Sequence, residues 1–222
     1  MSGRWSGSPD VGPLVHQPPG DLRVPPGAPA AFLDRDGVLN EAVPDPQTGA
    51  MESPLEVADV RLLQGAADAA RRLASAGYAL VCVSNQPAAA KGKATIERLQ
   101  AVHERALALL AEEGVQIATS RLCPHHPEGV VPELTRRCGC RKPAPGMLLH
   151  AARALDLDLE SSWMLGDTDS DVHAGGAAGC RTVLLEYPRS AHKRAAGGEP
   201  DVRATDLPDG VAKLLDLGAR SR

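Results

Sequence analysis

The sequence predicts an α/β domain in which helices cover both faces of a doubly wound parallel sheet. Short runs that are apolar throughout, each of strand length, alternate along the chain with longer stretches in which apolar residues recur at helical spacing. Three of the short runs end directly in polar residues. Because ligands bind outside the carboxyl ends of the strands in such sheets, these endings are the place where a functional site is expected.

The chain is expected to become ordered at residue 30. Glycine and proline crowd residues 1–29, and such a composition resists both helix formation and sheet pairing, so a flexible extension is predicted there. The extension is either a passive tail or a docking segment. Residues 30–33, Ala-Ala-Phe-Leu, then form an apolar run typical of a buried parallel strand. The folded domain is expected to span residues 30–218.

The remaining elements follow from apolar spacing and from residues that end helices. Residues 41–60 carry several prolines and are expected to form a loop or flap. Thr95 can cap the start of one helix and Gly114 stands just after its end, and Gly77 stands just after the end of the preceding helix. Strands are expected at 78–83, 115–122, 163–165 and 181–185, and helices at 65–76, 95–112, 146–155, 171–178 and 209–217.

Composition excludes several classes of protein. The chain has 222 residues, enough for about one domain, and 28 acidic against 24 basic residues give a formal charge of −4. That balance argues against a nucleic-acid binder. The sequence contains no apolar run of about 18 residues, so no membrane-spanning helix is predicted. No secretory signal is recognised either, and a cytoplasmic, monomeric protein is expected. An odd number of cysteines, five, favours metal ligands or free thiols over disulfides.

Carboxylates gather at two of the strand endings. Asp34 and Asp36 follow the first strand, and two anions so close together need a cation or protonation. Asp167, at another strand ending, can supply a further oxygen ligand. A few oxygen ligands suit Mg²⁺, which retains water and binds phosphate oxygens. An isolated Asp-x-Asp is more often a turn, but its position after a buried strand favours the metal site.

A second group of chemically active residues lies at about 123–140. Cys123, His125, Cys138 and Cys140 match a closed tetrahedral Zn²⁺ site with three sulfur ligands and one nitrogen ligand. His126 is an equally good ligand on spacing alone, and free thiols remain an alternative. A disulfide between Cys138 and Cys140 would be strained. Cys82 and Cys180 are expected to be small core residues.

Four segments in order along the chain resemble the haloacid dehalogenase superfamily of phosphohydrolases. They are Asp34-Arg35-Asp36-Gly37-Val38, Ser84-Asn85, Lys142, and Gly166-Asp167 with Asp171. The resemblance covers roughly residues 30–187. It implies a Rossmann-like sheet with a small zinc-bound loop in place of a large cap domain.

The resemblance also implies a role for each residue. Asp34 would be the nucleophile that becomes an aspartyl phosphate, and Asp36 would be the general acid and then the general base. Ser84 would donate a hydrogen bond to the phosphoryl group, and Lys142 would neutralise charge on it.

The same resemblance implies a magnesium site. Asp34 and Asp167 would bind Mg²⁺, together with the backbone carbonyl of Asp36. Asp171 would stabilise this site without binding the ion directly.

The zinc loop narrows the resemblance to two families, the heptose 1,7-bisphosphate 7-phosphatases and the histidinol-phosphate phosphatases. Cys123-Pro124-His125-His126-Pro127 and the run from Cys140 to Met147 are similar to the heptose group, which favours His125 as the ligand. Asn85, Arg141 and Lys142 would then bind a small phosphorylated sugar, Arg141 with its planar guanidinium. Residues 87–89 and Thr168 depart from that group's usual sequence.

The predicted function is removal of the 7-phosphate from a heptose 1,7-bisphosphate, with Mg²⁺ as cofactor and structural Zn²⁺. Three alternatives remain at this stage: a histidinol-phosphate phosphatase, a zinc-stabilised interaction module without activity, and a DNA 3′-end phosphatase. The acidic balance of the chain disfavours the last of these.

Overall fold

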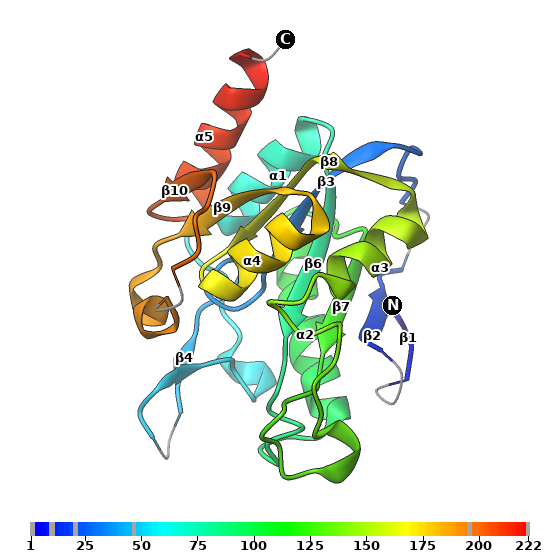
Figure 1. Ribbon diagram of the computed structural model, residues 1–222, viewed down its shortest axis with the longest axis vertical. Helices are drawn as coiled ribbons and strands as arrows, with labels where there is room; N and C mark the ends of the chain where they lie inside the picture. Colours follow the sequence, from blue (N-terminus) through cyan, green and yellow to red (C-terminus); the bar gives the residue numbers. More distant parts are fainter. Residues whose placement is uncertain (1–2, 9–11, 20–21, 46–47, 195–196, 221–222) are drawn as a thin grey trace.

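A single eight-stranded sheet forms the centre of the protein (Figure 1). The structure is a computed structural model that describes residues 3–8, 12–19, 22–45, 48–194 and 197–220. Six neighbouring strands are parallel, and two N-terminal strands continue the sheet in antiparallel pairing. Across the sheet the order is β1 (Arg4–Ser6), β2 (Leu14–Gln17), β7 (Thr119–Cys123), β6 (Ala79–Asn85), β3 (Ala28–Leu33), β8 (Leu157–Gly166), β9 (Arg181–Leu185) and β10 (Val202–Ala204).

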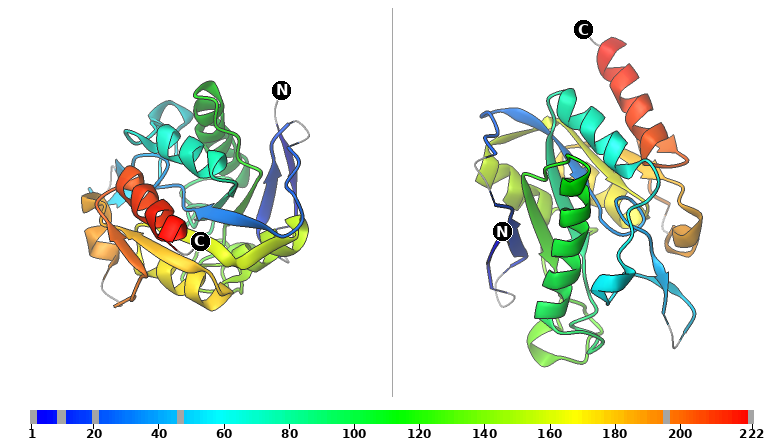
Figure 2. Two further views of the ribbon diagram at one scale, coloured as in Figure 1. Left: turned by 90° about the horizontal axis from the view of Figure 1, so that it is seen from above. Right: turned by 180° about the vertical axis from the view of Figure 1, so that it is seen from behind.

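Helices cover both faces of this sheet, which confirms the predicted fold class (Figure 2). One face carries α1 (Ala66–Ser75), α2 (Ile96–Glu112) and α5 (Leu207–Arg220), and the other carries α3 (Gly146–Leu155) and α4 (Asp169–Ala178). The central strand β3 serves both layers. Ala31 and Leu33 pack in the core below the first group of helices, and Ala30 and Phe32 pack in the core below the second. A strand buried on both faces has no polar face, which explains its uniformly apolar sequence.

The N-terminal segment differs from the flexible extension that its composition predicts. In its described part, β2 pairs with β7 and β1 pairs with β2, so this part of the segment extends the sheet. The pairing is stabilised by an aromatic cluster, in which Trp5 packs against His16 and against His103 of α2. The Trp5 indole also donates a hydrogen bond to Glu104. Pro13 and Pro18 flank β2 without interrupting it, and β1 contains no proline, so composition averaged over the segment concealed both strands.

Other boundaries shift by a few residues. The strand expected at 115–122 is confined to β7, and β8 begins six residues before the run expected at 163–165. Strand β10 was not predicted. The flap contains a small hairpin, β4 (Val43–Pro44) with β5 (Met51–Glu52), followed by a 3₁₀ turn, η1 (Val57–Asp59). Two further 3₁₀ turns are η2 (Pro132–Leu134) and η3 (Pro188–Lys193).

The carboxyl ends of the central strands, the flap and the loops rich in cysteine lie at one end of the molecule, the lower end in Figure 1. Asp34, Ser84 and Asp167 stand at the ends of β3, β6 and β8 there. Among the described residues, no helix is both long and apolar enough to cross a lipid bilayer.

One prediction concerns an irregularity in the centre of the sheet. The register between β3 and β8 shifts between Pro29 and Ala31, and the backbone N–H of Ala30 donates to Ser162 Oγ at 2.7 Å. Ala30 and Ser162 are both fully buried. Ser162→Ala leaves this N–H without a partner, so we expect the free energy of unfolding to fall by about 1–3 kcal/mol in urea denaturation.

The matched control is Ser161→Ala, at the exposed neighbouring position. It is expected to change the free energy of unfolding by less than about 0.5 kcal/mol. Equal stabilities for the two variants would contradict the role given to Ser162.

Candidate active site

Lys142 lies at the centre of the site. Its ammonium group is within 3.0 Å of Asp34 Oδ2 and within 2.6 Å of Asp171 Oδ1, and it donates a hydrogen bond to the carbonyl oxygen of Val83 at 2.9 Å. Lys142 is 2% exposed, and its position fixes the two carboxylates relative to the end of β6. Burial alone would lower the pKa of Lys142, but Asp171 and Asp34 raise this pKa above its ordinary value, which keeps the side chain charged.

The charges around Lys142 do not balance. Asp34, Asp167 and Asp171 bring carboxylate oxygens within 4.8 Å of one another, so three carboxylates and one ammonium leave a formal charge of −2. Burial, followed by mutual repulsion, raises the pKa of Asp167 to about 8, and burial also raises the pKa of Asp34 to about 6. Asp167 Oδ1 is buried without a hydrogen-bond partner among the described residues. Three oxygen donors with excess negative charge fit a divalent cation such as Mg²⁺.

Two glycines allow these carboxylates to approach. Gly37 has a φ of +87°, and a Cβ atom there would overlap the carboxylate of Asp167. A Cβ atom on Gly166 would overlap the side chain of Asp171. Asp171 is held from the other side by the backbone N–H and the hydroxyl of Thr168, which both donate to Asp171 Oδ2. Thr168 therefore caps α4 and fixes the carboxylate that pairs with Lys142.

A ring of hydrogen-bond donors surrounds Asp36. Arg35 donates through Nε and Nη2 at 3.1 and 3.0 Å, Asn40 donates at 2.9 Å, Ser53 of the flap at 2.8 Å and Gln86 at 2.6 Å. Burial alone would raise the pKa of Asp36, but the Arg35 guanidinium and these hydrogen bonds bring the pKa below its ordinary value. Asp36 is therefore a carboxylate in this arrangement, and its pKa is shifted in the direction opposite to that of Asp34.

Four of these donors were missed as site residues from the sequence. Arg35 and Gln86 stand next to predicted residues, so their neighbourhood was a usable signal. Asn40 and Ser53 reach Asp36 from the turn after β3 and from the flap, and nothing in their sequence surroundings marks them.

A cavity of about 240 Å³ leads away from Asp36. Ser53 and Gln86, which both bond to Asp36, form part of its wall. The flap and the loop after β6 supply the rest, including Pro87 and Ala88 from the segment that departs from the heptose group. A molecule whose reacting oxygen lies beside Asp36 can thus extend between the flap and this loop.

Asn85 contacts Lys142 through the backbone. Its side-chain oxygen accepts from the N–H of Lys142 at 3.0 Å, and its side-chain nitrogen donates to the carbonyl oxygen of Lys142 at 3.0 Å. Both ends of the amide are used in this way, which positions the lysine. Ser84, by contrast, is buried beside the carboxylates and accepts a hydrogen bond from Gln86 at 3.1 Å.

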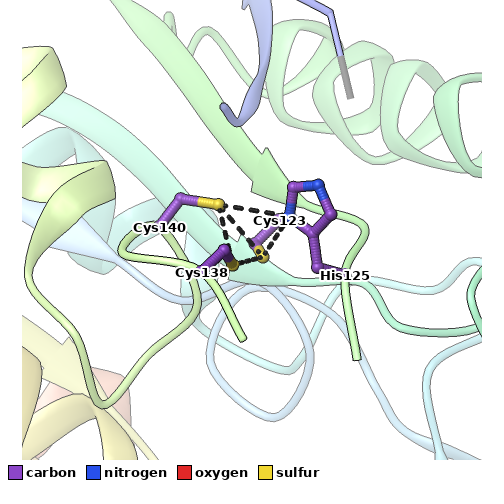
Figure 3. A group of neighbouring side chains, drawn as sticks. All are labelled: Cys123, His125, Cys138 and Cys140. Carbon is purple, nitrogen blue, oxygen red and sulfur yellow. Dashed lines mark hydrogen bonds between the residues drawn. The ribbon is translucent and has the colours of Figure 1, made fainter. Parts of the chain in front are cut away.

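The predicted cysteine and histidine residues form one compact group (Figure 3). The Sγ atoms of Cys123, Cys138 and Cys140 lie 3.3–3.6 Å apart, and His125 Nδ1 is 3.5 Å from Cys123 Sγ and 3.4 Å from Cys140 Sγ. Sulfur ligands on a tetrahedral Zn²⁺ with bonds of about 2.3 Å are separated by about 3.8 Å. All three cysteines are free thiols, so the group is a candidate metal site and contains no disulfide.

The surroundings of this group resolve the choice between the two histidines. His126 is partly exposed, and its Nδ1 accepts from the N–H of Glu128, whereas His125 points into the sulfur cluster. On the far side of the His125 ring, Nε2 lies 2.8 Å from Arg136. Arg141 donates to the carbonyl oxygen of His125, so the predicted substrate-binding arginine packs against the same loop.

The fold and these strand-end groups define a hydrolase of the HAD-like class. Residues 139–214, which include Lys142, Asp167 and Asp171, match the HAD-hydrolase-like family.

Similar proteins point to one family in this class. D-glycero-beta-D-manno-heptose-1,7-bisphosphate 7-phosphatase of Yersinia pestis is 38% identical over 186 residues, which cover 82% of this chain and 95% of the relative. The D-glycero-alpha-D-manno-heptose-1,7-bisphosphate 7-phosphatase of Photorhabdus laumondii is 35% identical over 163 residues, 72% of this chain and 85% of the relative. The chain therefore belongs to the heptose-1,7-bisphosphate 7-phosphatase family of HAD-like hydrolases, and it is a phosphatase.

A solved structure agrees with this assignment. The D,D-heptose 1,7-bisphosphate phosphatase of B. bronchiseptica, complexed with magnesium and phosphate, is 30% identical and superposes with a TM-score of 0.70 over 85% of this chain and 99% of that one.

The contacts of Asn85 generate a prediction. Asn85→Ala removes both hydrogen bonds to the backbone of Lys142, so the ammonium loses its fixed position, and we expect kcat to fall by about 10- to 100-fold. Steady-state kinetics with a phosphate ester measure this. A rise in KM with kcat unchanged would instead show that Asn85 acts only by binding substrate.

Proposed function

We propose that this phosphatase removes the 7-phosphate from D-glycero-D-manno-heptose 1,7-bisphosphate through an aspartyl-phosphate intermediate. The observation that carries the proposal is the position of Lys142 between Asp34 and Asp171, at the carboxyl ends of the parallel strands. The names of its relatives support the sugar, and both 1-phosphate anomers occur among those names.

Asp34 is the nucleophile in this proposal. One of its oxygens attacks phosphorus, and the bond from phosphorus to the sugar oxygen breaks as the acyl phosphate forms. Oδ1 of Asp34 accepts the backbone N–H of Arg35 at 2.7 Å and Oδ2 faces Lys142, so the carboxylate is oriented before substrate binds. Lys142 balances the charge that develops on the phosphoryl oxygens, and Ser84 donates a hydrogen bond to one of them.

Asp36 moves the proton. It transfers a proton to the departing sugar oxygen, then takes one from the water that hydrolyses the acyl phosphate. In the free enzyme Asp36 is ionised and hydrogen-bonded by four side chains, so the acid role requires substrate to replace some of these donors and Asp36 to take up a proton from solvent as substrate binds. Ser53 and Gln86 line the cavity and are the donors that a bound sugar reaches first.

Asp34 and Asp167, with the backbone carbonyl of Asp36, would hold Mg²⁺, and Asp171 would support them. The ion would offset the excess negative charge of the site and that of the phosphoryl group. The magnesium in the B. bronchiseptica structure supports this assignment.

Zn²⁺ in the Cys₃His group would be structural. Cys140 is two residues before Lys142, so a metal that fixes Cys140 also fixes the chain that carries Arg141 and Lys142. Arg141 would bind phosphate or hydroxyl oxygens of the sugar.

A substrate panel tests the proposed function. Phosphate release is measured with both anomers of heptose 1,7-bisphosphate, histidinol phosphate and fructose 1,6-bisphosphate in the presence of Mg²⁺. We expect one heptose anomer to give the highest kcat/KM, and Asp34→Asn to lower its turnover by about 10⁴-fold or more. Histidinol phosphate as the best substrate would overturn the proposed function while leaving the mechanism in place.

The matched control for Asp34 is Asp169→Asn. Asp169 is a buried carboxylate in the acidic loop whose Oδ2 accepts the N–H of Gly197, a contact that asparagine preserves. Activity within about fivefold of the parent is expected from this variant.

A second prediction concerns the zinc group. Cys138→Ala removes one sulfur ligand, so we expect loss of bound zinc, a lower melting temperature and lower kcat, because the loop that carries Lys142 loosens. Inductively coupled plasma mass spectrometry measures the metal. Cys180→Ala, at a buried free cysteine outside the group, is the control and should retain one zinc per chain. Full zinc content in Cys138→Ala would contradict the assignment.

A further inference from the structure

The cavity beside Asp36 contains an ion pair that the proposed mechanism does not use. Lys93, in the loop after β6, and Asp45, in the flap, both line the cavity, and Lys93 Nζ is 2.5 Å from Asp45 Oδ2. The pair joins the two walls between which the body of a substrate has to lie. The two side chains differ in burial, because that of Asp45 is 6% exposed and that of Lys93 is 35% exposed.

Asp45 is fixed in its position by the flap itself. Its Oδ1 accepts hydrogen bonds from the backbone N–H and the hydroxyl of Thr48, at 3.0 and 3.1 Å, and its backbone N–H donates to the carbonyl oxygen of Ala50. Oδ2 faces Lys93. The flap thus holds the Asp45 carboxylate in a fixed position, and the more exposed Lys93 side chain pairs with it.

Acidic residues outnumber lysines in the cavity wall, so the wall as a whole repels an anion. Besides Asp45, the wall contains Glu52, Glu56 and Asp59, and its cations are Lys91 and Lys93. Glu56 pairs with Arg98 at 2.7 Å and Glu52 lies 3.7 Å from Lys193, so these two acids have partners outside the wall. Of the two lysines in the wall, Lys93 is the one whose charge is neutralised by an acid of the same wall.

In the proposed function one phosphate of a sugar bisphosphate lies at Asp34, and this cavity, which begins at Ser53 and Gln86 beside Asp36, is the space that the other end of the sugar can enter. A second phosphate dianion attracts the ammonium of Lys93 more strongly than one carboxylate does, but it also meets the repulsion of Asp45. Binding therefore requires Lys93 to exchange one anion for another. A sugar monophosphate requires no such exchange and leaves the ion pair intact.

We infer that Asp45 is a specificity-determining residue: its carboxylate competes with the second phosphate of a bisphosphate for Lys93 and thereby weakens the binding of bisphosphates relative to monophosphates. This rests on the proposed function in so far as the physiological substrate is a bisphosphate. It predicts that the natural enzyme binds its bisphosphate less tightly than the same cavity would without Asp45.

The test is Asp45→Asn, in which the side-chain oxygen can still accept from Thr48 while the charge is lost. We expect KM for heptose 1,7-bisphosphate to fall about tenfold at low ionic strength, with kcat and the KM for heptose 7-phosphate unchanged within about twofold. Lys93→Met, in which the cation is lost, is expected to raise the KM for the bisphosphate about tenfold and to leave the monophosphate unaffected.

The matched control is Asp59→Asn, which removes a negative charge from the same wall at an exposed residue for which the structure gives no ion pair. It should change the KM for the bisphosphate by less than about twofold. Equal effects of Asp45→Asn and Asp59→Asn would overturn the inference in favour of a general charge effect. A rise in KM for both substrates in Asp45→Asn would show that the pair only holds the flap in place.

A second assay separates this inference from the proposed function. The hydrolysis of p-nitrophenyl phosphate is inhibited with fructose 1,6-bisphosphate and, separately, with fructose 6-phosphate. The ratio of the two inhibition constants should shift about tenfold towards the bisphosphate in Asp45→Asn. If the parent enzyme releases no phosphate from heptose bisphosphate, the proposed function fails, and this ratio still decides the role of Asp45. An unchanged ratio overturns that role.

Discussion

The site depends on one buried positive charge. Lys142 lies between two carboxylates with its ammonium almost out of reach of water, and each of the three groups would be unfavourable there without the others. Neighbouring residues hold these three side chains in position. The amide of Asn85 holds the backbone of Lys142, Thr168 holds Asp171, and the glycine at 37 leaves room for Asp167. The site is thus built around a cation that the fold supplies, with space for a second cation beside it.

The same constraint connects the catalytic residues to the cysteine and histidine group. Cys140, Arg141 and Lys142 are consecutive, so a displacement of the loop at Cys140 also displaces the ammonium group of Lys142. In the proposed zinc-bound form, four ligands on one ion would add rigidity to this loop beyond that of its own apolar packing. A metal in the candidate group would thus influence the position of Lys142 from two residues away.

Sequence alone predicted the parts of this protein that obey local rules. The apolar strand predicted at 30–33, the helices with capping residues and the polar residues at strand ends follow from periodicity and topology, and the structure has them there, with β3 beginning two residues earlier than predicted. The strands at 4–6 and 14–17 could not be predicted, because three or four residues carry no periodic signal and the pairing of β2 with β7, which β1 then extends, is a long-range contact. The donors around Asp36 illustrate the same limit. Ser53 reaches that carboxylate only because the flap folds back over the site.

The N-terminal strands have a consequence for the association behaviour of the chain. β7 would be an edge strand without β2, and an uncovered edge offers its N–H and C=O groups to any other strand, including that of a second copy. β7 also ends at Cys123, the first member of the sulfur cluster. Removal of residues 1–17 would therefore expose a template for intermolecular β-pairing on the strand that carries Cys123 of the candidate metal group, so self-association would also disturb that group.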